Sequence, residues 1–282
     1  MIITRLSLGL GNNLFQYALG RRLAIERNTE LFLDFSGENE GRRRYALDYI
    51  SRFNMIRSVA SKKDLMKIIL LNKFPFLNLG HKNSVFTEKT HSFDLDVLGV
   101  PQNSYLTGYW QSEKYFKTVE NTIRKDLKLK EPQGKKYQDF LDRIMKSNSI
   151  SIHFRRDDFM SEKNLRIFNT CTPDYYHNAV SYLSGKISAP ELFVFSDDIE
   201  WVKQNIKFNF PTTFVSGNGL ADYQEIILMS ACKYNIIANS TYSWWGAWLN
   251  DNPQKIVITP KKWFVDPDRD EKDLIPEEWI KI

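Results

Sequence analysis

The organisation of the carboxyl-terminal half follows from the stretch Ser149-Ile-Ser-Ile-His153-Phe-Arg155-Arg156-Asp157-Asp158. Its apolar residues Ile150, Ile152 and Phe154 alternate with polar ones, and this period of two predicts a β-strand. Two arginines and two aspartates follow the strand directly. Adjacent arginines at the end of a buried strand are costly unless an anion compensates them, and such strand ends are where open α/β sheets bind ligands. The guanidinium fork suits phosphate oxygens, which favours a phosphate-binding site. An internal network of Arg–Asp ion pairs is the alternative interpretation.

Strands and helices alternate regularly around this stretch. Short apolar runs predict strands at 149–154, 191–196, 212–216, 234–238 and 255–259. Helices are expected near 173–184, 199–205, 221–232 and 242–250. The first of these has a typical start at Thr172-Pro173. Apolar strands separated by helices predict a parallel sheet covered on both faces.

The amino-terminal half begins with a similar unit. Residues 2–8 predict a strand that runs into Gly9-Leu-Gly11-Asn12, a helix with one apolar face follows, and residues 30–35 predict a second strand. This order is typical of a Rossmann-like α/β unit. Residues 36–103 predict a helix around 64–71 within an otherwise loop-rich insertion, and a strand is expected at 104–110.

A Pro- and Gly-containing stretch near the middle of the chain predicts two domains. The stretch Glu131-Pro-Gln-Gly134 interrupts the amino-terminal half, and a helix is expected to run from there to about Met145. We therefore expect an amino-terminal domain of residues 1–147 and a carboxyl-terminal domain of residues 148–282.

The charge of the chain is unevenly distributed. The composition, 42% hydrophobic and 26% charged, is that of an ordinary globular protein. Residues 1–147 hold 25 Lys and Arg against 16 Asp and Glu, a net of +9, and residues 148–282 hold 14 against 18, a net of −4. The basic half fits contact with an anionic membrane surface or substrate, while its short charge runs favour a solvated surface. No nucleic-acid-binding motif accompanies them, so we expect no nucleic-acid partner.

Neither a metal site nor a membrane span is expected. The two cysteines, Cys171 and Cys232, form no CxxC pair, and the four histidines lack metal-ligand spacing. No apolar run approaches the ~20 residues that span a bilayer. Asn12, Asn13 and Gln16 interrupt what would be the core of a signal peptide. We expect a cytoplasmic protein, with peripheral contact to the cytoplasmic face of the membrane as an additional expectation.

Polar side chains follow three of the predicted strands. The three groups are His153 with Arg155 and Arg156, then Ser196-Asp197-Asp198, and then Asn239-Ser240-Thr241. The carboxyl ends of parallel strands open on one edge of a sheet, so arginines, carboxylates, hydroxyls and helix amides should converge there. This set favours a nucleoside diphosphate, with the arginines and amides on the phosphates and a carboxylate on the ribose or a guanine ring. The alternative for the aspartates is capping of the helix that follows.

The same residues carry a family resemblance. The chain resembles the bacterial α-1,2-fucosyltransferases of glycosyltransferase family 11 in four motifs. They are Gly9-Leu-Gly11-Asn12-Asn-Leu-Phe15-Gln16-Tyr17-Ala18, His153-Phe-Arg155-Arg156-Asp157-Asp158, Phe195-Ser196-Asp197-Asp198 and Asn239-Ser240-Thr-Tyr-Ser243-Trp244-Trp245. These motifs span almost the whole chain in the order of the family. The second is shared with α-1,6- and protein O-fucosyltransferases, whereas the first and last indicate the α-1,2 group.

The resemblance implies a fold and a reaction. The fold is α/β and GT-B-like, with two Rossmann-like domains whose mainly parallel sheets face each other across a cleft. The carboxyl-terminal domain would bind GDP-β-L-fucose, and the amino-terminal domain would lie on the acceptor side. L-Fucose would pass, with inversion, to the 2-hydroxyl of a terminal β-galactoside in an oligosaccharide, without a metal or other cofactor. The alternatives are a fucosyltransferase of another linkage (α-1,6 or protein O-fucosyl) and a non-catalytic module that binds nucleotide sugars or glycans.

The resemblance also implies roles for individual residues. Arg155 and Arg156 would neutralise the departing β-phosphate, with Arg155 in direct contact, and Asp158 would orient an arginine. Fixed charge of this kind is often the largest single contribution to catalysis. The expected donor-binding residues are Gly11, Asn12, Gln16, His153, Asp197, Asp198, Asn239, Ser240 and Thr241.

Two further points concern the base and the tryptophans. The candidates for a base that takes the acceptor proton are Asp34, Asp94, Asp96, Glu113 and Asp158. None is assigned: only Asp158 lies inside a motif, and for Asp158 pairing with one of the arginines is the favoured role. Trp244 and Trp245 follow the last binding loop on a predicted helix, where core packing is favoured over sugar stacking.

Overall fold

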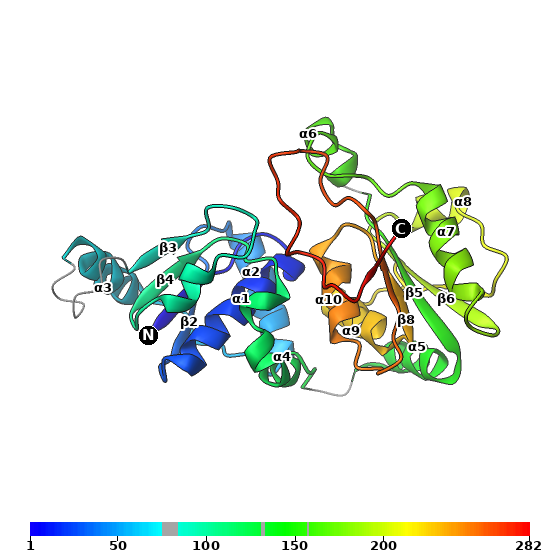
Figure 1. Cartoon of the computed structure of the whole chain (residues 1–282). Helices are drawn as coiled ribbons and strands as arrows, with labels where there is room; N and C mark the ends of the chain where they lie inside the picture. Colours follow the sequence, from blue (N-terminus) through cyan, green and yellow to red (C-terminus); the bar gives the residue numbers. More distant parts are fainter. Residues whose placement is uncertain (75–83, 131–132, 157) are drawn as a thin grey trace. The chain divides into compact units, whose positions relative to one another are not determined.

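The chain divides into two compact units. The computed structural model describes residues 1–74, 84–130, 133–156 and 158–282, without the side chain of Asp158 (Figure 1). Unit 1 consists of Met1–Pro132 and Asp270–Pro276, and unit 2 consists of Gln133–Arg269 and Glu277–Ile282. This division differs from a boundary at residue 147, because helix α5 (Lys135–Lys146) packs on helix α9 (Asp222–Ala231) of unit 2.

Unit 1 contains a four-stranded parallel sheet. Its strands are β1 (Ile2–Arg5), β2 (Leu31–Asp34), β3 (Val85–Thr87) and β4 (Ser104–Thr107), in the order β2-β1-β4-β3. Helix α1 (Leu10–Glu26) packs on β1 and is buried along most of its length. The strand expected at 104–110 is shorter than predicted: it ends at Thr107, and Trp110 beyond it adopts a φ of +57°, outside the extended region.

The other helices in the described part of unit 1 lie between its strands or follow β4. They are α2 (Glu40–Arg52), α3 (Lys62–Lys73), α4 (Glu120–Asp126) and the 3-10 helices η2 (Leu95–Gly99), η3 (Glu113–Tyr115) and η4 (Lys117–Val119). The helix predicted around 64–71 is confirmed as α3. A capping box between Ser61 and Asp64 fixes its start.

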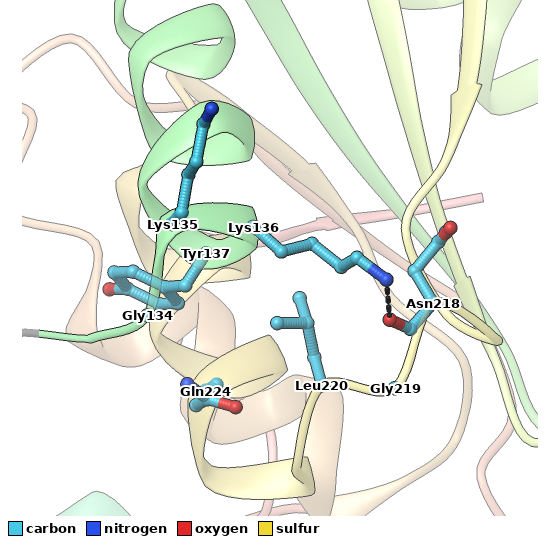
Figure 2. A pocket seen from close by; sticks show the side chains of 8 residues that line it. All are labelled: Gly134, Lys135, Lys136, Tyr137, Asn218, Gly219, Leu220 and Gln224. Carbon is cyan, nitrogen blue, oxygen red and sulfur yellow. Dashed lines mark hydrogen bonds between the residues drawn. The ribbon is translucent and has the colours of Figure 1, made fainter.

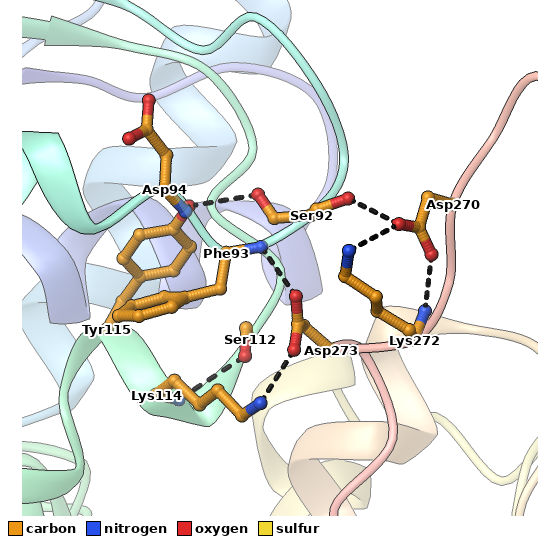
Figure 3. A network of polar contacts seen from close by, with 9 residues as sticks. All are labelled: Ser92, Phe93, Asp94, Ser112, Lys114, Tyr115, Asp270, Lys272 and Asp273. Carbon is orange, nitrogen blue, oxygen red and sulfur yellow. Dashed lines mark hydrogen bonds and ion pairs between the residues drawn. The ribbon is translucent and has the colours of Figure 1, made fainter.

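The carboxyl-terminal segment Asp270–Pro276 belongs to unit 1 through a polar network (Figure 3). Asp273 accepts a hydrogen bond from the backbone N–H of Phe93 at 2.9 Å and pairs with the Lys114 ammonium at 2.6 Å. Asp270 accepts a hydrogen bond from the Ser92 hydroxyl at 2.7 Å. A segment near the end of the chain is thus fastened to the loop that precedes η2.

Unit 2 contains a six-stranded parallel sheet. Its strands are β5 (Asn148–Phe154), β6 (Pro190–Ser196), β7 (Thr212–Phe214), β8 (Tyr234–Ile236), β9 (Val257–Thr259) and β10 (Ile280–Lys281). The strand order is β10-β9-β8-β5-β6-β7, with every pair parallel. Read from β7, this is the 3-2-1-4-5-6 order of the Rossmann fold. The five strands predicted in this half are confirmed, and β10 was not predicted.

Helices connect these strands. They are α6 (Glu162–Leu165), α7 (Pro173–Ser184), α8 (Ile199–Asn205), α9, α10 (Thr241–Leu249) and the 3-10 helix η5 (Asp158–Met160). The predicted start of α7 is confirmed: Thr172 caps it and Pro173 occupies its first turn.

Strand β5 is buried on both faces. Ile150, Ile152 and Phe154 belong to a core cluster that includes Tyr176 of α7. The alternating serines are buried as well, because they belong to a polar layer in which the Asn235 side-chain amide donates to the Ser151 hydroxyl at 2.8 Å. The apolar residues of β5 therefore lie in an apolar core layer, and its serines lie in a buried, hydrogen-bonded polar layer.

Candidate active site

The three polar strand ends of unit 2 lie side by side. β5 pairs with β6 on one side and with β8 on the other, and all three strands are parallel. Their carboxyl ends therefore open on one edge of the sheet. The strand order reverses between β5 and β8, and such a switch point is where doubly wound sheets bind ligands.

Arg155 follows β5 and is held by a carboxylate that follows β6. Its Nη1 lies 3.0 Å from Oδ2 of Asp197, and its guanidinium lies 5.4 Å from the centre of the Phe159 ring. The side chain of Arg155 is 31% exposed, so part of the guanidinium faces solvent. The ion pair with Asp197 restrains the orientation of this guanidinium.

Arg156 is held differently from its neighbour. Its guanidinium carbon lies 3.3 Å from the centre of the Trp201 ring, and its Nε lies 3.5 Å from Oδ2 of Asp198. Its backbone N–H donates to Oδ1 of Asp197 at 2.9 Å. Among the described residues the buried Nε has no hydrogen-bond acceptor. Both aspartates after β6 thus position the arginines after β5, and Asp198 also caps α8 through the N–H of Trp201.

His153 lies at the same edge as a neutral ring. Burial, assisted by the charge of Arg155, lowers the pKa of its imidazole to about 3. The ring centre lies 5.5 Å from that of Tyr242, and Nδ1 is buried without a hydrogen-bond partner in the described part of the chain. A neutral imidazole with an unused nitrogen can donate or accept a hydrogen bond at neutral pH.

The third strand end leads into α10. The Asn239 side-chain amide donates to the backbone carbonyls of Asn169 and, at 3.0 Å, Trp263, so its known contacts are internal. Ser240 precedes the helix without capping it by its hydroxyl, and Thr241 is the first helical residue. The first turn of α10 contains no acidic residue. The amino end of a helix of this kind is the positive end of its dipole and suits an anion.

Glu225 is a functional candidate that the sequence did not indicate. Its Oε2 accepts a hydrogen bond from the Ser216 hydroxyl at 2.6 Å, and that hydroxyl oxygen accepts one from the backbone N–H of Ser196 at 3.0 Å. Burial, with a contribution from Asp222, raises the pKa of Glu225 to about 7. A half-buried acid therefore supports the end of β6. No motif surrounds it, and the signal lies only in the fold.

A cavity of about 360 Å³ lies where α5 begins (Figure 2). Its walls come from Gly134–Tyr137, the loop 218–220 and Gln224. The Lys136 ammonium donates to the backbone carbonyl of Asn218 at 2.6 Å. None of the residues expected to bind the donor lines this cavity.

The glycine turn of unit 1 occupies the switch point of its own sheet. Gly11, Asn12 and Gln16 lie at the start of α1, after β1, which pairs with both β2 and β4. The Gln16 amide is buried, and it donates to the Ser7 hydroxyl at 3.0 Å and to the Gly108 carbonyl at 2.8 Å. Gln16 thus ties the end of β1 to the end of β4.

Asn12 of the same turn contacts another residue of unit 1. Oδ1 of Asn12 accepts a hydrogen bond from the Gln111 amide at 2.8 Å. Gly9 has an ordinary φ of −80°, whereas Leu8 beside it has a φ of +68°, an uncommon value for a residue with a side chain. The donor-binding roles expected of Gly11, Asn12 and Gln16 stay predictions.

The candidate bases have varied surroundings. Asp34 is buried and accepts hydrogen bonds from Ser36 and Tyr105, Asp94 caps η2, and Glu113 pairs with Lys117 at 3.0 Å. The Asp158 side chain and Asp157 lie outside the described residues. No base is assigned.

The tryptophans after the third strand end fill the core. Trp244 and Trp245 are fully buried, and Trp244 packs against Trp248 and Trp279. Core packing of Trp244 and Trp245, which the sequence favoured over sugar stacking, is confirmed.

Comparison with known proteins supports these features. Residues 41–282 match the family described as Glycosyl transferase family 11. An α-1,2-colitosyltransferase of Escherichia coli is 34% identical over 100% of this chain and 99% of its own. The O-antigen biosynthesis glycosyltransferase WbnK of Escherichia coli is 32% identical over 98% of this chain and 99% of its own. A galactoside α-(1,2)-fucosyltransferase 1 of Leontocebus fuscicollis is 22% identical over 63% of this chain and 52% of its own.

A solved structure is similar in fold. An Arabidopsis thaliana FUT1 mutant in complex with GDP superposes with a TM-score of 0.52 at 11% identity, covering 98% of this chain and 72% of that one. The two parallel-sheet units and this similarity define a fold of the GT-B class. The chain belongs to glycosyl transferase family 11.

Proposed function

We propose that this glycosyltransferase moves L-fucose from GDP-β-L-fucose to the 2-hydroxyl of a terminal β-galactoside, with inversion at the anomeric carbon. The observation that carries the proposal is the position of Arg155 and Arg156 at the end of β5, next to the strand whose loop leads into α10. Two guanidiniums and a helix amino end are suited to a diphosphate.

The geometry supports a mechanism based on fixed charge. As the bond from the sugar to the β-phosphate breaks, positive charge grows on the anomeric carbon and negative charge on the phosphate. Asp197 and Asp198 hold the arginines before the donor arrives, so little reorganisation is needed during the reaction. The arginines and the α10 amides would neutralise the leaving group without a metal ion.

A second donor sugar has specific support. The relative that is 34% identical over the whole chain is named for colitose. Colitose is fucose without its 3-hydroxyl, so the same diphosphate contacts would serve both donors. We therefore also propose GDP-colitose as a candidate donor. An enzyme specific for GDP-fucose would hold a buried polar group that hydrogen-bonds the 3-hydroxyl. That group would lose its partner when colitose binds, and this loss would discriminate strongly against GDP-colitose.

The direct test offers both donors to the full-length protein. GDP-fucose and GDP-colitose are each incubated with a panel of galactose-terminated oligosaccharides, and the products are analysed by NMR. We expect an α-1,2 product from GDP-fucose. Transfer from GDP-colitose alone would replace the donor assignment, and another linkage would replace the acceptor assignment. Binding of GDP without transfer to any acceptor would indicate a non-catalytic module.

A further inference from the structure

Helix α3 of unit 1 carries an apolar row that faces solvent. Met66, Ile69 and Leu70 are 54%, 52% and 47% exposed. Their spacing of i, i+3 and i+4 makes them neighbours on one face of the helix. Single exposed apolar residues are ordinary, whereas a contiguous row indicates an interaction surface.

The opposite face of α3 holds the helix in place. Ile68 is buried there, and the helix packs on β3 and β4. The capping box fixes the amino end, with the Ser61 N–H donating to the Asp64 carboxylate at 2.8 Å. The exposed row is therefore presented on a helix that other contacts already stabilise.

Four lysines accompany the row. They are Lys62, Lys63, Lys67 and Lys73, and the only acidic residue of the helix is Asp64, so four positive charges against one negative give α3 a net of +3. Within the described ranges none of the four lysines forms an ion pair. Helix α2 differs, because three of its four arginines, Arg42, Arg44 and Arg52, pair with carboxylates.

This chemistry favours a lipid surface over a protein partner. The cores of protein interfaces are depleted in lysine. Helices that lie in the plane of a membrane instead combine an apolar face with lysines, whose long stems let the ammonium groups reach the lipid phosphates. Charge complementarity selects a bilayer that contains anionic lipids.

We propose that α3 docks unit 1 on the surface of an anionic bilayer. The helix lies parallel to the membrane plane, Met66, Ile69 and Leu70 enter between the headgroups, and the lysines contact phosphates. Three apolar side chains and four cations give weak, reversible binding that falls steeply with salt. Of the net charge of +9 in residues 1–147, α3 carries +3, so part of the excess positive charge lies on this one helix.

The test is co-sedimentation of the full-length protein with vesicles. Vesicles of phosphatidylcholine mixed with phosphatidylglycerol are compared with phosphatidylcholine alone, at low and at high salt. We expect binding to the mixed vesicles at low salt and its loss at high salt. Absence of binding to the mixed vesicles at low salt would overturn the proposal.

Variants separate the charges from the apolar row. Lys63→Glu/Lys67→Glu should lower the partition coefficient by roughly tenfold or more, and Ile69→Gln/Leu70→Gln by roughly tenfold. Lys146→Glu/Lys186→Glu makes the same charge change on unit 2 and should bind as the unchanged protein does. Equal vesicle binding by all variants would show that α3 does not contribute to the interaction.

Two controls guard the interpretation. Urea unfolding of each variant shows that the fold is intact, and the salt dependence of the unchanged protein tests the charge argument even if a variant unfolds. Light scattering tests self-association. A dimer that Ile69→Gln/Leu70→Gln dissociates would assign the row to a second copy of the chain and overturn the membrane assignment.

Discussion

Arg155 and Arg156 are neighbours in sequence with different surroundings. Arg155 keeps a partly exposed guanidinium beside Asp197, whereas Arg156 lies flat on Trp201 with its Nε enclosed. We therefore expect Arg155 to make the direct phosphate contact and Arg156 to occupy a supporting position. An Arg-to-Lys change is not conservative at either place, because a point charge replaces a planar fork.

The first prediction concerns Arg155. Arg155→Ala should lower kcat by about 10²- to 10³-fold, since it removes fixed positive charge from the leaving group. Arg155→Lys should recover little of this loss. Steady-state kinetics with GDP-fucose measure both variants. Arg143→Ala, which removes a surface arginine paired with Glu191, is the matched control and should turn over normally. Near-normal kcat in Arg155→Ala would show that the leaving group is neutralised elsewhere.

The second prediction follows from the same cations. If the arginines and the α10 amides replace a metal, removal of divalent ions should leave the rate unchanged. The rate is measured after extensive treatment with EDTA and again after addition of Mg²⁺ or Mn²⁺. A loss of activity that a metal restores would contradict neutralisation by protein groups alone.

The third prediction uses the raised pKa of Glu225. Its pKa is about 7 in the folded protein and near 4.5 in the unfolded chain, so the folded state binds the proton more tightly. The free energy of unfolding should therefore fall as the pH rises from about 4.5 through about 7. Glu225→Gln removes this dependence and should gain about 1 to 3 kcal/mol relative to the unchanged protein between pH 5 and pH 8. Urea unfolding at the two pH values tests it. A parallel pH dependence in both proteins would place the titration elsewhere.

At the scale of elements, the position of α10 depends on its packing against α9. The contact is close at Gly246, where an added Cβ would lie 2.8 Å from Cβ of Met229. The tryptophans on the same helix are buried, so α10 has little room to move. A shift of α10 would also move Ser240 and Thr241 at its start.

The fourth prediction tests this packing. Gly246→Ala should destabilise the protein by about 1 to 3 kcal/mol, although alanine favours helices, because the clash involves an atom attached to the backbone. Met229→Gly is itself destabilising, because it removes a buried side chain. In double-mutant cycles it should nevertheless abolish the extra cost of Gly246→Ala, whereas Met229→Ala should keep that cost, since the Cβ remains. Urea unfolding of the single and double variants gives the comparison. A stabilised Gly246→Ala would show that the two helices separate without cost.

At the scale of the whole molecule, the chain passes between its two units more than once. It leaves unit 2 after Arg269, joins unit 1 for Asp270–Pro276, and returns to unit 2 at Glu277. The attachment in unit 1 depends on Asp273, whose pKa is lowered by its hydrogen bonds to Lys114 and Phe93 although burial opposes the shift. The same segment is therefore part of the fold of unit 1.

The fifth prediction concerns this attachment. Asp273→Asn should weaken two charge-assisted hydrogen bonds and cost on the order of 1 to 3 kcal/mol of local stability. Hydrogen exchange of residues 92–94 and 270–276 should become faster, while β5 and β6 should keep their protection. Asp251→Asn, at an exposed position of unit 2, is the control. Unchanged exchange in both segments would show that other contacts hold the segment.

The local sequence pattern determines much of the secondary structure and the family membership of this protein. The alternation in 149–154, the start of α7 at Thr172-Pro173 and the order of strands and helices in unit 2 could be predicted because each depends on residues adjacent in the chain. The order of the motifs likewise indicates family 11 without reference to any tertiary contact.

The tertiary structure decided what depends on distant residues. It placed β5 between β6 and β8, assigned α5 to unit 2 and returned Asp270–Pro276 to unit 1. It also brought Glu225 beneath the end of β6 and left one face of α3 exposed. Strand order, burial and the shifted pKa of Glu225 all depend on contacts between residues that are distant in the sequence. The spacing of neighbouring residues does not determine those contacts.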